Sequence, residues 1–140
     1  MLKSQLIWDL NTAADIVSIA ANVLEGEIYA QQKNYGKAIP LFRKAVAIED
    51  KLNYNEPPDW FFSVRLTLGY WLLEAGNHKE AESVYNDDLM TFPENGWALK
   101  GLYNAQMGQG LNEAAAQTNK RFEKAWKWAD IEIKSSRHFN

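Results

Sequence analysis

The stretch LGYWLLEAGNHKEAESVYNDDLMTFP, residues 68–93, decides the fold. Its apolar residues recur at three- and four-residue steps on both sides of Gly76, which is typical of two amphipathic helices joined at a glycine. Gly69 and Ala81 stand inside the two helical segments, although a mid-helix glycine costs about 1 kcal/mol relative to alanine. We expect these small residues to let the helices approach closely, with the bulky Tyr85 filling the gap between layers. The stretch therefore predicts a packed helical hairpin.

The same pattern recurs downstream at a fixed distance. Three pairs of identical residues are each separated by 34 positions, namely Leu68 and Leu102, Gly76 and Gly110, and Ala81 and Ala115. Self-similarity at such a period is the signature of stacked helical repeats, in which each hairpin buries one face against its neighbour. The sequence therefore predicts a helical repeat array.

The pattern also lies upstream, but at a longer step. Gly26 precedes Gly69 by 43 positions, and Ala38 precedes Ala81 by the same distance. The nine residues beyond 34 fall around LNYNEPPDW, residues 52–60. This stretch is interpreted as an insertion between two repeats.

The insertion has two competing interpretations, a structural elbow and a ligand site. Pro57 and Pro58 each exclude the residue before them from the helical region. Tyr54 and Trp60 are expected to clamp the elbow onto the adjoining helices. We favour an elbow whose extra residues extend the preceding helix before the chain crosses over.

With these residues at these steps, the chain resembles the tetratricopeptide repeat (TPR) family over roughly residues 19–129. The combination of EPPDW…R…LG with NDDL…PENGW is also similar to the C-terminal region of longer bacterial TPR proteins of uncharacterised role. The resemblance implies an all-α fold, a TPR-like right-handed α-α superhelix of about three helix pairs, roughly six helices, with a long C-terminal capping helix. The third unit departs from the pattern, because Tyr103 replaces the small residue and Asn119 the expected aromatic.

The expected organisation is a single TPR-like domain with short segments at both ends. Residues 1–11 are interpreted as the remnant of an upstream helix, which would make the chain a fragment of a longer protein, and residues 135–140 as a flexible tail. The domain covers residues 12–134, with units of about 12–52, 59–93 and 94–134 and the inter-repeat insertion at 51–59.

Local signals set the expected helix ends. Thr12 begins the first helix in a capping-box pattern with Asp15. Asp59 is expected to cap the third helix, which would carry Phe61 on its inward face. The last helix is expected to run from about residue 112 to residue 133.

Composition argues against several classes of function. The 140 residues contain no cysteine, so disulfides and thiolate metal sites are excluded. The formal net charge of -3 requires a nucleic-acid binder to carry a local basic patch. The one basic cluster is interleaved with acids, with Lys120, Arg121, Lys124 and Lys127 among Glu113, Glu123, Asp130 and Glu132. A solvated helix face is the better interpretation. No run approaches the ~18 apolar residues of a membrane span, so we expect no nucleic-acid or membrane partner and a cytoplasmic location.

No catalytic constellation is apparent. His78 and His138 lie 60 positions apart and outside any metal-ligand spacing. Asp87 and Asp88 are adjacent on a helix, so their side chains diverge by about 100° instead of converging for acid–base chemistry. We therefore expect no catalytic residue, no metal and no cofactor.

The resemblance implies a concave groove lined by the first helix of each unit, which in this family holds extended peptides or partner helices. Carried over by position, the candidate groove residues are Val23, Glu27, Gln31, Ser63, Leu66, Thr67, Tyr70, Glu74, Trp97, Lys100 and Asn104. Lys100 and Asn104 share a helix face and resemble part of a carboxylate clamp, although an ordinary exposed pair is the alternative. A patch around Trp97, Tyr70 and Trp71 is the first place where we expect binding.

The resemblance and the absence of catalytic patterns favour a non-catalytic protein–protein interaction module that binds a peptide or partner helix. The alternatives are a structural C-terminal cap or self-association domain, giving a weak homo-oligomer, and an accessory domain of an enzyme encoded upstream. The sequence does not identify the partner.

Overall fold

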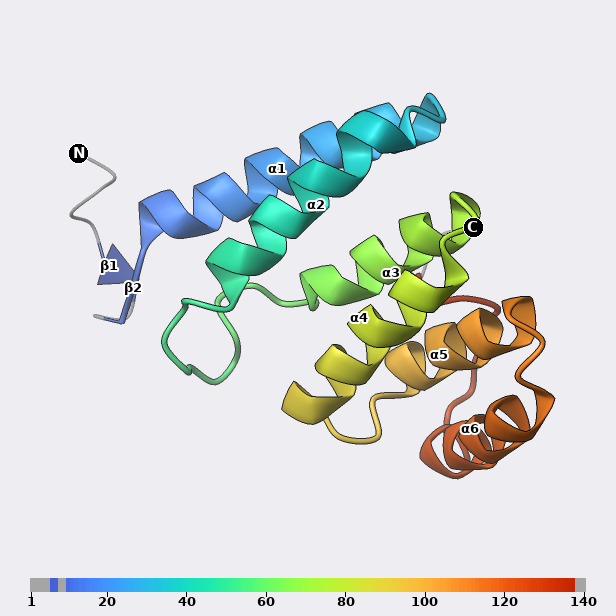
Figure 1. Cartoon of the computed structure of the whole chain (residues 1–140). Helices are drawn as coiled ribbons and strands as arrows, with labels where there is room; N and C mark the ends of the chain where they lie inside the picture. Colours follow the sequence, from blue (N-terminus) through green and yellow to red (C-terminus); the bar gives the residue numbers. More distant parts are fainter. Residues whose placement is uncertain (1–5, 8–9, 138–140) are drawn as a thin grey trace. The chain divides into compact units, whose positions relative to one another are not determined.

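The computed structural model of the chain describes residues 6–7 and 10–137. In this part of the chain a pair of two-residue strands precedes six helices (Figure 1). The elements are β1 Leu6–Ile7, β2 Asn11–Thr12, α1 Ala13–Gln31, α2 Tyr35–Glu49, α3 Val64–Glu74, α4 His78–Thr91, α5 Gly96–Gly108 and α6 Asn112–Ala125. The all-α class expected from the sequence is confirmed. The chain forms two compact units, Met1–Val64 and Arg65–Asn140.

The first unit is built on the α1–α2 hairpin. Thr12 caps α1 as expected, because its side chain accepts a hydrogen bond from the Asp15 backbone N–H. Gly26 of α1 faces the Phe42 ring of α2, and a Cβ at Gly26 would lie 2.7 Å from Phe42 Cε1. The missing side chain therefore admits the aromatic ring between the two helices. Lys33, in the turn that joins them, has a φ of 58°.

The segment between α2 and α3 is an irregular elbow and not an extension of α2, which ends at Glu49. Asn11 holds this elbow with its amide: Asn11 Nδ2 donates to the Asn53 carbonyl at 3.0 Å, and Asn53 N donates to Asn11 Oδ1 at 2.7 Å. Asn11 Nδ2 also donates to Asp59 Oδ2 at 2.6 Å. The amide side chain thus satisfies backbone groups that lie outside any helix.

The structure corrects three expectations about residues 54–61. Asp59 does not cap α3, which begins at Val64; the Glu49 carboxylate accepts from Val64 N instead, at 3.0 and 3.3 Å. Phe61 is not inward but 85% exposed. Tyr54 does not clamp the elbow, since it is 80% exposed. Trp60 does, because it packs against the core cluster of the first unit formed by Ile19, Ala45 and Val64.

Part of the N-terminal segment lies in the antiparallel strand pair, with Leu6 opposite Thr12 and Ile7 opposite Asn11. Residues 1–5 and 8–9 lie outside the described part. The origin of residues 1–11 as the remnant of an upstream helix stays a prediction, as do the domain boundaries.

The second unit repeats the glycine-to-aromatic contact that Gly26 and Phe42 make in the first unit. Gly69 of α3 faces the Tyr85 ring of α4, where an added Cβ would lie 2.4 Å from Tyr85 Cζ. Gly69 and Gly26 therefore occupy equivalent helix contacts, as the 43-residue step predicts. Tyr85 also reaches the next helix, because a Cβ at Gly101 of α5 would lie 2.2 Å from the same ring carbon. The Tyr85 ring is thus wedged between α3 and α5.

The α4–α5 turn is organised by Asp88, which is fully buried. Asn95 Nδ2 donates to Asp88 Oδ2 at 3.0 Å, while Asn95 Oδ1 accepts from Trp97 N at 3.1 Å and caps α5. One amide therefore links a buried carboxylate to the start of the next helix.

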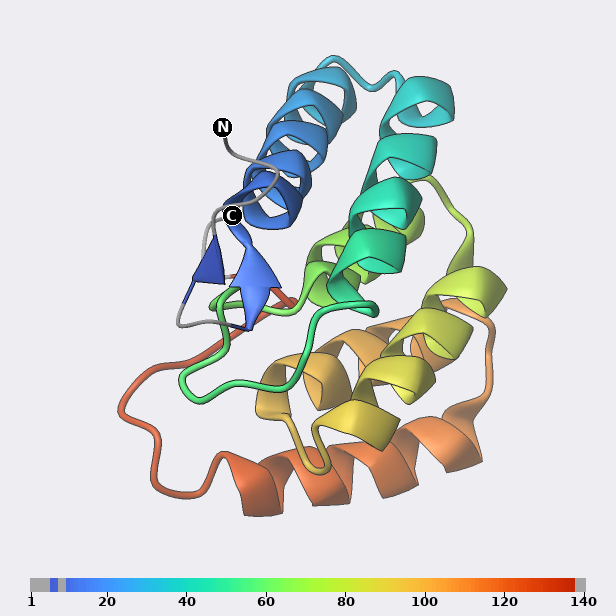
Figure 2. The ribbon, with the colours of Figure 1, turned by 90° about the vertical axis from the view of Figure 1, so that its left-hand side faces the viewer.

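Helix α6 ends at Ala125 instead of continuing to residue 133. Trp126 packs on Gly96 of α5, where a Cβ would lie 2.3 Å from Trp126 Cε3, and Trp126 Nε1 donates to the Ile131 carbonyl at 2.7 Å. The chain after Trp126 is irregular and turns back from the end of α6 (Figure 2). This return, absent from the sequence expectation, brings residues 134–137 to α3 and α5.

Candidate functional site

The expected groove residues divide between the two units. In the first unit, Val23 packs against the Ile19–Ala45–Val64 cluster, Glu27 is half-buried, Gln31 is exposed at the end of α1, and Ser63 is buried. In the second unit, α3 and α5 carry Leu66, Thr67, Tyr70, Glu74, Trp97, Lys100 and Asn104. The face that α3 and α5 form in the second unit is the candidate site.

This α3–α5 face holds a segment of the chain itself, residues 134–137. Asn104 Nδ2 of α5 donates to the Lys134 carbonyl at 2.9 Å. Ser136 Oγ donates to the Leu66 carbonyl of α3 at 2.9 Å, and Ser136 is fully buried. The expectation of a flexible tail from residue 135 onward is therefore wrong for residues 135–137, while residues 138–140 lie outside the described part.

The Ser136 hydroxyl also meets the phenol of Tyr85, with 2.7 Å between Ser136 Oγ and Tyr85 Oη. Tyr85 is buried between Gly69 and Gly101, so its hydroxyl reaches residue 136 from α4. Burial raises the pKa of the Tyr85 phenol well above its ordinary value, and the charge of Asp88 adds to this while the hydrogen bond to Ser136 opposes it. The phenol is therefore neutral, and its proton is available for a hydrogen bond.

Arg137 continues the contact on the aromatic residues of α3. Its guanidinium carbon lies 4.9 Å from the Tyr70 ring centroid and 5.0 Å from that of Trp71. The two rings meet edge to face, with centroids 5.0 Å apart and an interplanar angle of 78°. Distances below about 6 Å are typical of cation–π attraction.

The expected patch of Trp97, Tyr70 and Trp71 is divided. Tyr70 and Trp71 receive Arg137, whereas Trp97 packs edge-on against Trp126, with centroids 5.4 Å apart. The expected clamp is divided as well. Lys100 Nζ lies 5.1 Å from the ring centroids of both Tyr103 and Phe122, while Asn104 donates to a backbone carbonyl.

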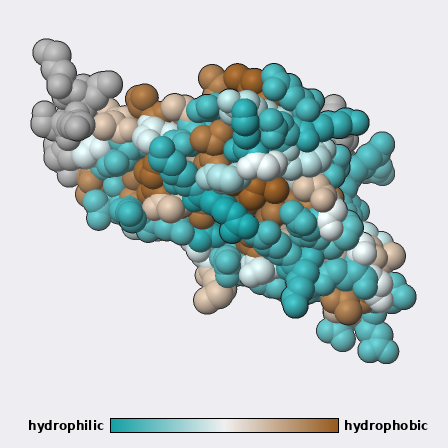
Figure 3. Space-filling view, turned by 45° about the horizontal axis from the view of Figure 1, so that its top comes forward, coloured by the Kyte–Doolittle hydropathy of each residue, from teal (hydrophilic) through white to brown (hydrophobic). Residues whose placement is uncertain are grey.

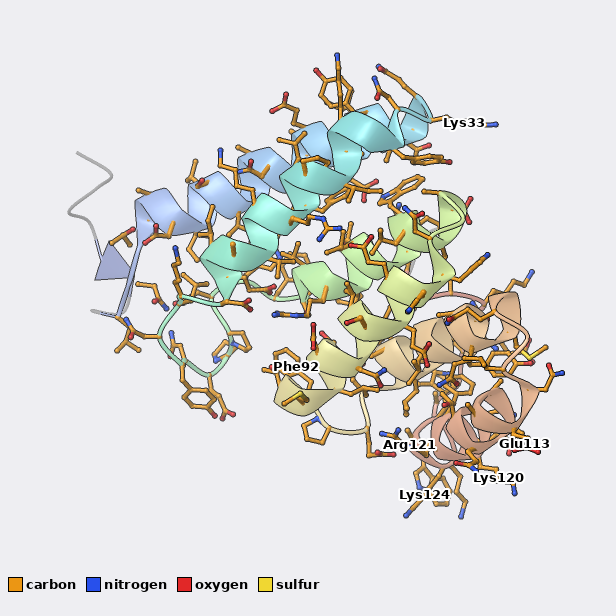
Figure 4. All side chains as sticks on the ribbon, in the orientation of Figure 1. Lys33, Phe92, Glu113, Lys120, Arg121 and Lys124 are labelled. Atoms are coloured by element: carbon orange, nitrogen blue, oxygen red, sulfur yellow. The ribbon has the colours of Figure 1, made fainter. Side chains whose placement is uncertain are left out.

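The basic residues of α6 form a surface face and not a pocket. Lys120, Arg121 and Lys124 are exposed and lie close together in Figure 4. Arg121 is paired with Glu94 of the α4–α5 turn, with 2.7 Å between Arg121 Nη2 and Glu94 Oε1. This agrees with the interpretation of a solvated helix face.

Within residues 6–7 and 10–137, no helix has the length and apolar character needed to cross a membrane. The same residues gather no three His, Asp or Glu side chains in a position to hold a metal ion. In Figure 3 the visible surface is a mixture of hydrophilic residues with scattered apolar ones.

These features define an all-α, TPR-like helical repeat fold. No family model matches the chain, and no curated protein matches it in sequence. The crystal structure of MamA protein, which contains tetratricopeptide repeats, is similar with a TM-score of 0.62 and 17% sequence identity. The similarity covers 82% of this chain and 60% of that chain. The likeness shows the fold.

Sequence reasoning missed Ser136, Arg137 and the role of the Tyr85 hydroxyl. One signal was present: Tyr85 stands where the preceding repeat has Phe42, 43 positions upstream. Because a buried tyrosine needs a hydrogen-bond partner that phenylalanine does not, this difference indicates a polar contact at the tip of the ring. Nothing in the residue pattern indicates that the partner is Ser136.

Proposed function

We propose that this chain is a non-catalytic protein-interaction module that binds an extended peptide or a partner helix on the face of α3 and α5. The observation that carries the proposal is the hydrogen bond from Asn104 Nδ2 to the Lys134 carbonyl, by which α5 holds a non-helical segment through its backbone. Backbone contacts of this kind bind an extended chain irrespective of its side chains. The Ser136–Leu66 hydrogen bond supports the same use of α3.

A pull-down with the full-length chain tests this proposal. The double variant Tyr70→Ala with Asn104→Ala removes one aromatic contact and one amide from the face. Tyr54→Ala is the matched control, because Tyr54 is an exposed tyrosine of the other unit. The double variant should lose its bound partners and the control should keep them. Partners bound to the wild type should cross-link to α3 or α5. Partners that remain bound to the double variant would count against the proposal.

A second candidate function, a self-association or structural cap domain, is supported by the outer face of α1. Val17, Leu24 and Ile28 are exposed there although they recur at helical spacing. Leu24 and Ile28 correspond to Gly101 and Ala105 of α5, each 77 positions downstream, and both of those residues are buried. The repeat equivalence thus supports a face that another helix can cover.

Sedimentation of the wild type and of the Leu24→Lys variant distinguishes this second function. A weak homo-oligomer that dissociates on Leu24→Lys would support it. If the wild type remains monomeric at high protein concentration, self-association is excluded as its function.

A further inference from the structure

The α3–α5 face contacts side chains of residues 134–137 as well as their backbone. We propose that this face is a recognition site for a Ser–Arg dipeptide within an extended segment of a partner protein, and that Ser136–Arg137 of this chain occupies the site until such a partner displaces it. The inference rests on the proposed function and names the class of its ligand.

The serine preference follows from the way in which Tyr85 is held. Ser136 is fully buried, and its hydroxyl lies between Tyr85 Oη, at 2.7 Å, and the Leu66 carbonyl, at 2.9 Å. The Tyr85 ring packs closely between two helices, because it fills the space that Cβ atoms at Gly69 and Gly101 would take. A larger side chain is excluded, and alanine would remove a partner from a buried phenol, which is costly.

The arginine preference follows from the two rings on α3. The guanidinium of Arg137 lies within about 5 Å of two aromatic centroids, 4.9 Å for Tyr70 and 5.0 Å for Trp71. A planar, weakly hydrated guanidinium stacks on aromatic faces better than a compact ammonium. The site therefore favours arginine over lysine after the serine.

The resident segment is attached in a way that permits exchange. Residues 134–137 lie outside any helix or strand, and the connector residues 127–132 are exposed. Ser135 and Ser136 are buried, but the segment is held by hydrogen bonds and ring contacts and not by buried apolar side chains. Segments with few buried apolar contacts open at lower free energy than packed helices. The segment can therefore leave while helices α3 to α6 stay folded.

A segment of a partner protein is better able to displace residues 134–137 than the same segment of a second copy of this chain. The tethered segment competes at an effective concentration on the order of millimolar, and the same segment from another copy offers the same contacts. A foreign segment can add contacts. Glu74, one turn beyond Tyr70 on α3, is exposed and can offer such a segment a further charged contact.

The test uses the full-length chain and a fluorescein-labelled peptide with the sequence of residues 131–140. Ser136→Trp places a side chain in the protein that the buried site cannot hold, which vacates the face. Ser83→Trp is the matched control, because Ser83 is exposed on α4. Circular dichroism checks the helical content of each variant. If Ser136→Trp does not fold, it is replaced by Arg137→Glu, which keeps Ser136.

Fluorescence anisotropy should show that the peptide binds Ser136→Trp at least tenfold more tightly than it binds the wild type or Ser83→Trp. A peptide carrying Ser136→Ala and Arg137→Glu should bind the Ser136→Trp variant of the protein at least tenfold more weakly than the unchanged peptide does. Equal binding to the wild type and the vacated variant, or indifference to the peptide substitutions, would overturn the inference.

Two further outcomes separate this inference from others. A partner that is lost on Tyr70→Ala with Asn104→Ala, yet contacts the face through a segment without Ser–Arg, leaves the proposed function standing and overturns the inference. If the wild type forms a dimer and Ser136→Trp does not, the site binds the segment of a second copy. That result would overturn the inference that it binds a segment of another protein.

Discussion

Tyr85 Oη and Ser136 Oγ lie 2.7 Å apart, although the two residues are separated by 51 positions in the sequence. The contact joins α4 to the segment after α6, and both residues are fully buried. It is the point at which the repeat packing and the candidate binding face meet.

Removing the phenol hydroxyl should destabilise the protein modestly. Tyr85→Phe loses one buried hydrogen bond while keeping the ring between Gly69 and Gly101, so the free energy of unfolding should fall by about 1 kcal/mol. Urea denaturation measures the change, and the exposed Tyr54→Phe is the control. In a double-mutant cycle, Ser136→Ala should cost less when combined with Tyr85→Phe than alone. Strict additivity of the two changes would show that the hydroxyls do not interact.

The same phenol predicts an alkaline limit to stability. The pKa of Tyr85 is raised in the folded protein, first by burial, above the value of 10.0 that we take for the unfolded chain. Its contribution is therefore fully present below pH 10. Above that pH the unfolded chain releases a proton that the folded chain keeps, so stability falls by up to about 1.4 kcal/mol per pH unit.

Chemical denaturation between pH 9 and pH 11 measures this slope. Because other tyrosines and lysines titrate in the same range, the informative quantity is the difference between the wild type and Tyr85→Phe. That difference should be constant below pH 10 and shrink above it. A pH-independent difference would contradict a raised pKa for Tyr85.

Glycine-to-alanine substitutions should have opposite effects at different positions. A Cβ at Gly69 would lie 2.4 Å from Tyr85 Cζ and one at Gly26 would lie 2.7 Å from Phe42 Cε1, so each alanine should cost about 1–3 kcal/mol through overpacking. At Gly36, the nearest atom is Asn34 Oδ1 at 4.0 Å, and alanine should be neutral or stabilise by up to about 1 kcal/mol. Thermal denaturation compares all three. Tolerance of alanine at Gly69 would contradict the close approach of α3 and α4.

Lys33 offers a gain in stability. Its φ of 58° is one that a side chain disfavours, and the equivalent turn positions, Gly76 and Gly110, are glycines with φ of 79° and 75°. Lys33→Gly should stabilise the chain by up to about 1 kcal/mol. Lys44→Gly, at an exposed position inside α2, should instead cost about 1 kcal/mol. Thermal denaturation measures both, and the same sign for the two substitutions would contradict this conformation at Lys33.

The helix pairs could be predicted because their determinants are local and periodic. Gly26 with Ala38 and Gly69 with Ala81 recur at one spacing, and that spacing alone indicates which helices pack. The elbow could not be predicted in the same way. Asn11 bonds to Asn53 across 42 positions, and Glu49 replaces Asp59 as the cap of α3 across 15. Such polar contacts between distant residues leave no periodic trace in the sequence.

The end of α6 illustrates the same limit. The apolar stripe of the last helix continues past Ala125 in the sequence, but Trp126 packs on Gly96 and its indole N–H bonds to the Ile131 carbonyl. Tertiary packing thus overrides helix propensity. The expected site residues on α3 and α5 were reasonable candidates because they follow from helix geometry. Their occupant was not predicted, since residues 134–137 have no pattern of their own.

Tyr85 brings a side chain of α4 to the proposed binding face. Its Cα belongs to α4, its ring passes between Gly69 of α3 and Gly101 of α5, and its hydroxyl contacts Ser136. An occupant that supplies a hydroxyl and one that does not will leave this phenol in different states. If the face binds a partner as proposed, helix α4 would therefore respond to the occupant through the Tyr85 side chain alone.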